Sequence, residues 1–172
     1  KVLLFTNTKK VWRLNTKGDY WVFNFKTNTL TQIGKTLPPS SLMFAKFSPD
    51  GNTIAYVSDN NLYSEAYATG NIQPLTNDGT VSLMNGTFDW AYEEEFACRD
   101  GFRWSPDSKS IAYWQINASS IKKFYMVNNT DSIYYIIVIF PFYCSTNIFV
   151  FINIFMLAIA SQMARLNWLI LF

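Results

Sequence analysis

The sequence predicts an all-β fold made of repeated antiparallel sheets. The first reason is an internal repeat, because residues 47–56 read FSPDGNTIAY and residues 104–113 read WSPDSKSIAY. In each copy Pro fixes φ at the second turn position and Asp favours the tight return into a strand. The second reason is a series of short runs rich in β-branched and aromatic residues, separated by Asn, Asp and Gly. Two copies in matching surroundings favour a repeat architecture over an isolated hairpin.

The expected strands fall into three groups along the chain. Upstream of the first Ser-Pro-Asp turn, residues 1–7, 19–25 and 30–32 form a meander without the motif. The first copy contains strands over residues 42–48, 53–58, 61–65 and 73–75, which form one antiparallel blade. Residues 101–116 with 124–127 begin a third blade. The fold class is therefore a partial β-propeller of about two and a half four-stranded blades, whereas closed propellers need at least about four.

An acidic insertion separates the two copies of the repeat. The copies are farther apart than the roughly 40 to 50 residues of an ordinary propeller repeat, so residues 78–100 are assigned to an insertion. Residues 89–96 read DWAYEEEF and place three carboxylates behind two aromatics, in a chain of which only 15% is charged. One interpretation is an acidic surface turn whose repulsion is relieved by water, and the other is a cation-binding site.

The composition excludes several classes of function. A net charge of +2 with scattered lysines and arginines gives no nucleic-acid footprint. The chain has no histidine, which removes the usual base of Ser-His-Asp and Cys-His hydrolases and the HExxH metal site. Its seven glycines form no nucleophile elbow, dinucleotide fingerprint or P-loop. Cys98 and Cys144 lack metal-ligand spacing and are expected to be free thiols. We therefore expect no catalytic residues, no metal and no cofactor.

The carboxyl-terminal part, residues 135–172, has a different composition. No charged residue occurs from Ser132 through Ala164. Three interpretations remain open: a membrane helix over residues 148–164, buried strands, or a stretch not selected for folding, as expected after a frameshift or read-through. The third is favoured because the common residues are those of A/T-rich codons, and because Asn153 weakens a membrane helix. At the other end Lys1 begins a strand already under way, and no signal peptide is visible.

Several motifs together resemble the N-terminal β-propeller of the dipeptidyl peptidase IV family, including its bacterial members. They are residues 89–96, residues 103–107 (RWSPD) and residues 124–132 (FYMVNNTDS), with residues 11–13 (VWR) matching the upstream arginine motif. The resemblance covers about residues 1–134. We therefore expect residues 1–134 to be a propeller fragment and residues 135–172 a hydrophobic tail.

The resemblance also implies a function. In that family the propeller caps an α/β-hydrolase domain whose serine triad releases N-terminal dipeptides, usually with Pro or Ala second, and that domain is missing from this sequence. Carried over by motif, Glu94 and Glu95 would bind the free amino terminus of the substrate and Arg13 would hold the dipeptide carbonyl. Trp90 and Tyr92 would be structural supports. The family is extracytoplasmic, being periplasmic, secreted or membrane-associated, and commonly homodimeric.

The chemistry of the glutamates agrees with this role and predicts a helix. A primary ammonium has three donors, two of which can be taken by converging carboxylates through charge-assisted hydrogen bonds. Adjacent side chains point to opposite faces of a strand, but lie about 100° apart on a helix. A short helix or turn is therefore expected, with Glu94 and Glu95 converging and Glu93 facing away to support the turn.

Two functions remain open for this sequence. The first is a fragment of a peptidase propeller that keeps the recognition residues for peptide amino termini and has no catalysis of its own. The alternative is a non-catalytic propeller-like module for protein interaction, with a membrane anchor if residues 148–164 form a helix.

Overall fold

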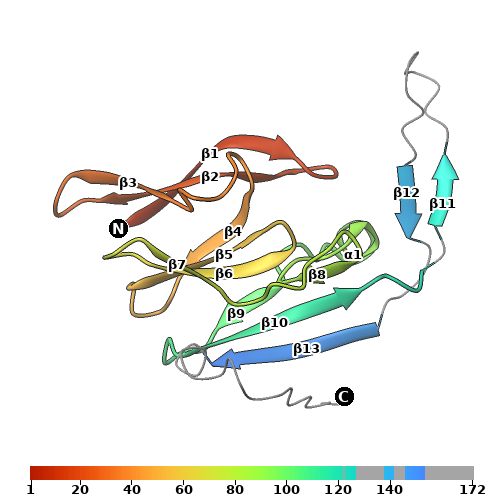
Figure 1. Ribbon diagram of the computed structural model, residues 1–172. Helices are drawn as coiled ribbons and strands as arrows, with labels where there is room; N and C mark the ends of the chain where they lie inside the picture. Colours follow the sequence, from red (N-terminus) through yellow and green to blue (C-terminus); the bar gives the residue numbers. More distant parts are fainter. Residues whose placement is uncertain (122, 127–137, 142–145, 154–172) are drawn as a thin grey trace.

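The computed structural model describes residues 1–121, together with the backbone of residues 123–126, 138–141 and 146–153 (Figure 1). Three antiparallel blades are arranged in Figure 1 from the red N-terminal strands through yellow to green, teal and blue, and a separate sheet of two strands stands apart from them. Among the described residues one helix, α1 (Trp90–Phe96), interrupts the strands. The expectation of an all-β, propeller-type fold with a short helical insertion is confirmed.

The first blade contains three strands. They are β1 (Val2–Lys10), β2 (Asn15–Asn24) and β3 (Thr29–Ile33), and β2 pairs with both neighbours. The β1–β2 hairpin carries Arg13 at its tip, between the two strands. Asp19 is buried in β2 and accepts hydrogen bonds from the Ser40 amide at 2.7 Å and the Asn7 side chain at 2.8 Å. This carboxylate fastens the hairpin to the connection that enters the next blade.

The second blade has the four strands expected from the first copy of the repeat. They are β4 (Leu42–Phe47), β5 (Thr53–Ser58), β6 (Asn61–Ala66) and β7 (Asn71–Pro74), paired in that order. Short pairing of Lys17 with Met43 and of Gly18 with Leu42 joins the first two blades into a 7-stranded sheet.

Both faces of β5 are buried because a blade lies on either side of it. Ile54 and Tyr56 belong to a hydrophobic cluster shared with the first blade. Ala55 and Val57 belong to a second cluster that includes Phe102 of the third blade. Successive side chains of a strand point to opposite faces, so the four central residues of β5, which lie between two neighbouring blades, are all apolar. The core of the molecule is therefore two interfaces between blades.

The third blade is arranged around β10 (Ser110–Asn117). On one side β10 pairs with β8 (Leu83–Asn85) and β9 (Phe102–Trp104), and on the other with β13 (Thr146–Asn153) along eight residue pairs from Ser110↔Asn153 to Asn117↔Thr146. β11 (Lys123–Met126) was expected in this blade, but pairs instead with β12 (Val138–Pro141) in a separate sheet of two strands. The expected place of β11 is wrong because β13 occupies the free edge of β10.

β12 and β13 lie within residues 135–172. The structure has strand at residues 148–153, so a membrane helix over residues 148–164 is wrong for that part, while residues 154–164 lie outside the described residues. Residues 127–132 of the third family motif also lie outside them. No helix in the part of the chain that the structure describes is long and apolar enough to cross a membrane.

The two Ser-Pro-Asp turns share a hydrogen bond between the Ser and Asp side chains. The Ser48 hydroxyl donates to Asp50 Oδ1 and the Ser105 hydroxyl to Asp107 Oδ1, each at 2.6 Å. The fourth turn residue has a left-handed φ in both copies, 70° at Gly51 and 62° at Ser108. The Ser108 hydroxyl also accepts a hydrogen bond of 3.0 Å from the Asp50 amide, so the first turn is bonded to the second.

Candidate functional site

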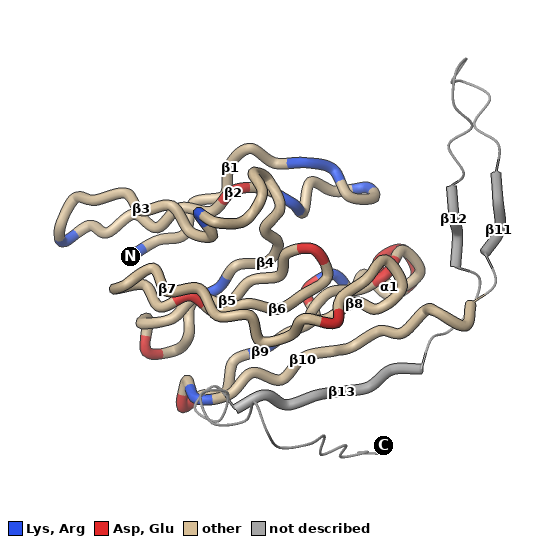
Figure 2. The backbone as a smooth tube through the Cα atoms, in the orientation of Figure 1, with Lys and Arg blue, Asp and Glu red and all other residues tan. Residues whose placement is uncertain are grey.

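The helix α1 forms because both of its ends are capped. Asp89 is the N-cap residue, and its side chain accepts the Tyr92 amide at 3.0 Å. Ala97 ends the helix in the left-handed region with φ 55°, and the Cys98 amide then donates to the Tyr92 carbonyl at 3.1 Å. The short helix expected for the glutamate run is confirmed, and Figure 2 shows its acidic residues in red.

The insertion that contains α1 closes on itself at its base. The Gly101 amide donates to the Gly86 carbonyl at 3.0 Å, and Thr87 forms an antiparallel bridge with Asp100. A Cβ on Gly101 would lie 2.8 Å from the Gly86 carbonyl carbon, so this close approach requires glycine. Residues 88–99 therefore leave the third blade and return to it at one point.

The three glutamates of α1 have three different environments. Glu93 is buried at 8% exposure, and its Oε1 lies 3.4 Å from Arg99 Nε, which is an ion pair rather than a hydrogen bond. The Glu94 side chain is 12% exposed and contacts Arg13. Glu95 is exposed, and no described residue forms an ion pair with it. This division follows from a helix that lies with one side against the blades.

Arg13 and Glu94 come together although they are 81 residues apart in the chain. Arg13 Nε lies 2.7 Å from Oε1 and 2.6 Å from Oε2 of Glu94. The Arg13 side chain is 79% exposed, and within the described residues its terminal guanidinium nitrogens have no hydrogen-bond acceptor. One nitrogen therefore orients the guanidinium while the other two face solvent.

Aromatic contacts connect α1 to the third blade. Tyr92 packs against Phe88, with ring centroids 5.5 Å apart, and against Phe96, at 5.7 Å. Phe88 in turn contacts Trp114 of β10 at 6.3 Å. Trp90 is half-buried at the first position of the helix. Such contacts fix the rotation of the helix about its axis, since turning it would remove Tyr92 from Phe88.

Neither of two cavities elsewhere in the described part of the chain is lined by α1. One, of about 580 Å³, lies beside the first Ser-Pro-Asp turn, and the other, of about 480 Å³, lies between β3 and β6. No cluster of three or more potential metal ligands occurs among the described residues. Cys98 is a free thiol, whereas Cys144 lies outside the described residues.

The positively charged partners of this region were not predicted from the sequence. Arg99 faces Glu93, and Lys46 of β4 faces Asp100 at the base of the insertion. The basic residues just after the glutamate run were a usable signal for Arg99 and Arg103. Nothing in the sequence pairs Lys46 with Asp100, because they are 54 residues apart and belong to different blades.

The sequence and the fold are both similar to those of known proteins. A family model described as the dipeptidyl peptidase IV N-terminal region matches residues 1–158 of this chain. The chain belongs to the dipeptidyl peptidase IV N-terminal family. The solved structure of Porphyromonas gingivalis dipeptidyl peptidase 4 is similar, with a TM-score of 0.80 and 26% identity, over 88% of this chain and 22% of that protein.

Curated relatives agree with membership of the dipeptidyl peptidase IV family. The chain is 35% identical over 125 residues to dipeptidyl-aminopeptidase B of Aspergillus niger, which is 72% of this chain. It therefore spans 14% of the length of that relative. Membership shows that the chain is related to peptidases, and the matched residues 1–158 include the insertion and the blades around it.

Proposed function

We propose that this chain is a substrate-recognition fragment of a serine dipeptidyl peptidase, with Glu94, Glu95 and Arg13 binding the amino-terminal end of a peptide. The observation that carries the proposal is the contact between Arg13 and Glu94, because it joins the two motifs that the family uses for the two ends of a dipeptide. Glu93, Trp90 and Tyr92 support the helix. The release of X-Pro or X-Ala dipeptides would belong to the longer protein.

The charges of the site fit a terminal ammonium. Glu94 and Glu95 supply two negative charges, and Arg13 supplies one positive charge. A bound ammonium would neutralise the remaining negative charge, whereas an acetylated or internal peptide nitrogen would leave it unpaired. The exposed terminal nitrogens of Arg13 remain available to donate to a carbonyl oxygen. The same three residues would therefore favour the first residues of a peptide with a free amino terminus over an internal segment of a chain.

In our proposal the catalytic residues lie outside this chain. An α/β-hydrolase domain elsewhere in the longer protein would supply the serine nucleophile and its base, since this chain has no histidine. By family resemblance we also propose an extracytoplasmic location and a homodimeric longer protein. The chain itself would bind peptide amino termini and would not bind nucleic acid.

The test is a comparison of two dipeptides on the purified chain. Binding of Ala-Pro and of N-acetyl-Ala-Pro is measured by amide chemical-shift titration, and turnover by an Ala-Pro chromogenic amide. We expect Ala-Pro to shift the α1 amides, the acetylated peptide to bind more weakly, and no turnover. Glu95→Gln should weaken Ala-Pro binding by about 1.5 to 3 kcal/mol, roughly 10- to 150-fold, because it removes a charge-assisted hydrogen bond.

Asp59→Asn is the matched control for Glu95→Gln. Asp59 is an exposed acid in the β5–β6 turn, remote from α1 in sequence, and the substitution removes the same charge. It should leave both affinities unchanged. Equal binding of the two dipeptides, or equal losses in the two variants, would mean that the glutamates are a solvated acidic surface.

A further inference from the structure

We propose that Lys46 is a positioning residue for the amino-terminus site, acting across the interface between the second and third blades. Lys46 belongs to β4, whereas the glutamate helix is rooted in the third blade at Thr87 and Asp100. This inference rests on the proposed function, because it concerns how the recognising side chains are held in place rather than which ligand they take.

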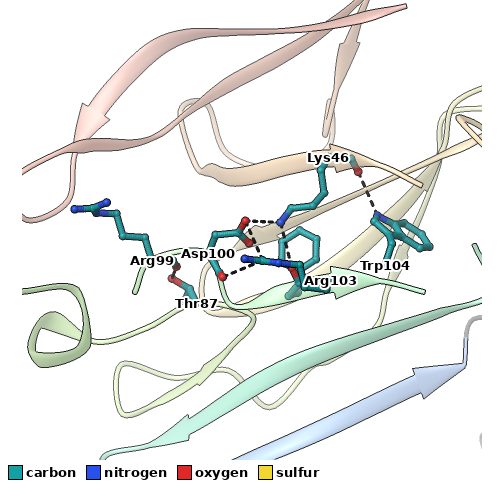
Figure 3. Close-up of polar contacts among 7 residues, drawn as sticks. Lys46, Thr87, Arg99, Asp100, Arg103 and Trp104 are labelled. Carbon is teal, nitrogen blue, oxygen red and sulfur yellow. Dashed lines mark hydrogen bonds and ion pairs between the residues drawn. The ribbon is translucent and has the colours of Figure 1, made fainter. Parts of the chain in front are cut away.

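Lys46 contacts the third blade through both its side chain and its backbone (Figure 3). Its ammonium forms an ion pair with Asp100 Oδ2 and donates to the Phe102 carbonyl at 3.1 Å. The same ammonium lies 4.1 Å from the centroid of the Phe102 ring. Its own carbonyl accepts the Trp104 indole N–H at 3.4 Å. One residue of β4 therefore holds the segment from Asp100 to Trp104 at both ends.

The ion pair between Lys46 and Asp100 is partly buried, so its loss would leave Asp100 with a weaker partner. The Lys46 side chain is 27% exposed and the Asp100 side chain 33%. Burial lowers the pKa of Lys46, and the hydrogen bond to Asp100 offsets part of that effect. Without the lysine, Asp100 would keep only Arg103, whose Nη1 lies 3.1 Å away on a side chain that is 68% exposed. An exposed arginine holds a carboxylate less firmly than a half-buried lysine with two further contacts.

Asp100 connects this ion pair to the glutamate helix. Its backbone bridges Thr87, whose hydroxyl donates to the Arg99 carbonyl at 3.4 Å. Arg99 pairs with Glu93 inside the helix, and Thr87 lies two residues before the N-cap Asp89. The segments that enter and leave α1 therefore meet at the bridge between Thr87 and Asp100, and Lys46 holds this bridge through Asp100.

The site needs this alignment because its parts come from different blades. Arg13 lies on the hairpin of the first blade, Glu94 and Glu95 are rooted in the third, and Lys46 lies on the second blade between them. A rotation of the third blade relative to the second would carry α1 away from Arg13. In catalysis an error of about 1 Å in the placement of a group can cost on the order of 100-fold in rate, and a misplaced binding group likewise loses contact with its ligand.

The experiment compares Lys46→Met with Lys109→Met in the full chain. Lys109 is exposed in the second Ser-Pro-Asp turn, so its substitution makes the same change in charge without touching the interface. Two quantities are measured: hydrogen exchange of the α1 amides against that of the β5 amides, and the ratio of the N-acetyl-Ala-Pro and Ala-Pro dissociation constants. Lys46→Met should speed exchange in α1 by about 10-fold more than in β5, because the opening is local. It should lower the ratio by about 5-fold.

Three further variants test the same ion pair if Lys46→Met does not fold. Asp100→Asn removes the same ion pair and should act in the same way, Lys46→Arg should restore most of the ratio, and Arg103→Met should have a smaller effect. Equal changes of exchange in α1 and β5 would show a merely structural role and overturn the proposal. A normal ratio for both Lys46→Met and Asp100→Asn would also overturn it, while leaving the proposed function intact. Equal binding of both dipeptides to the unaltered chain would instead remove the proposed function itself, and the positioning role with it.

Discussion

The carboxylate of Glu65 links the first two blades through hydrogen bonds to one of its oxygens. Its Oε2 accepts hydrogen bonds from the Gly34 amide at 2.8 Å and from the Tyr56 hydroxyl at 3.0 Å. Gly34 follows the last strand of the first blade, whereas Tyr56 and Glu65 belong to the second. Glu65 is 3% exposed, and burial raises its pKa although both donors act in the opposite direction.

This residue should make the stability of the chain depend on pH. A raised pKa means that folded Glu65 binds a proton more tightly than unfolded Glu65, whose usual pKa is 4.5. The free energy of unfolding should therefore fall as the pH rises from that value through the raised pKa, and the full penalty applies above it. Urea unfolding of the unaltered chain and of Glu65→Gln, between about pH 4 and pH 8, isolates this contribution.

The difference between those two unfolding curves should shrink at low pH, since Gln keeps an acceptor oxygen and has no charge. A constant difference at every pH would contradict the prediction. Glu65→Ala is the companion variant, because it leaves the Gly34 amide and the Tyr56 hydroxyl without an acceptor. Each orphaned donor should cost about 1 to 3 kcal/mol.

The helix α1 shows how an element too short to be stable alone is maintained. Seven residues are far fewer than the roughly 12 to 15 that an isolated helix needs in water. Its stability comes from Asp89 at the start, Ala97 at the end, and the closed base at Gly86 and Gly101. The glutamates are thus presented by a rigid turn rather than by a mobile loop.

Asp89→Ala should loosen this element without unfolding the blades. Asp89 is 4% exposed and caps the helix through the Tyr92 amide. Loss of an N-cap costs about 0.5 to 2 kcal/mol. Hydrogen exchange should therefore accelerate at the amides of Tyr92 and Glu93, while those of β5 keep their protection. Asp89→Asn is the control, because asparagine also caps helices, and similar exchange in both variants would contradict the role of the cap.

Elements with local causes can be predicted from the sequence, and elements with distant partners cannot. The four strands of the second blade are predictable because their turn residues and their alternating apolar and polar residues are adjacent in the sequence. The helix is predictable because the convergence expected of Glu94 and Glu95 is possible on a helical turn and impossible on a strand. In contrast, the partner expected for β11 is wrong, since the neighbour of β10 is decided by competition with β13. The contacts of Arg13 with Glu94 and of Lys46 with Asp100 depend on the packing of blades and have no signature in spacing.

At the scale of the whole molecule, the pairing of β10 with β13 connects residues 146–153 to the third blade. The family match to residues 1–158 also extends past the boundary at residue 134 that the composition indicated. The eight pairs between β10 and β13 would be lost in a chain cut at that boundary. β10 would then have an unpaired edge, which is a site for aggregation.

We therefore expect a chain of residues 1–134 to unfold at a lower urea concentration than the full chain, and a chain of residues 1–158 to resemble the full chain. The lost strand pairing is the physical reason, and a larger tendency of the shorter chain to aggregate should accompany it. Circular dichroism and urea unfolding of the three chains provide the measurement. Equal or greater stability of residues 1–134 would show that the tail is dispensable, as its composition suggested.

The hydrogen bond between the two Ser-Pro-Asp turns has a consequence for symmetry. Each turn occupies the same place in its blade, so the bond from the Asp50 amide to the Ser108 hydroxyl is a direct contact between one blade and its own copy. Whatever angle relates these two copies, a third copy bonded in the same way would be turned by that angle again. A ring closes only when a whole number of such steps completes the circle. The hydrogen bond to the Ser108 hydroxyl is thus one of the contacts that hold the angle between two successive copies of the repeat.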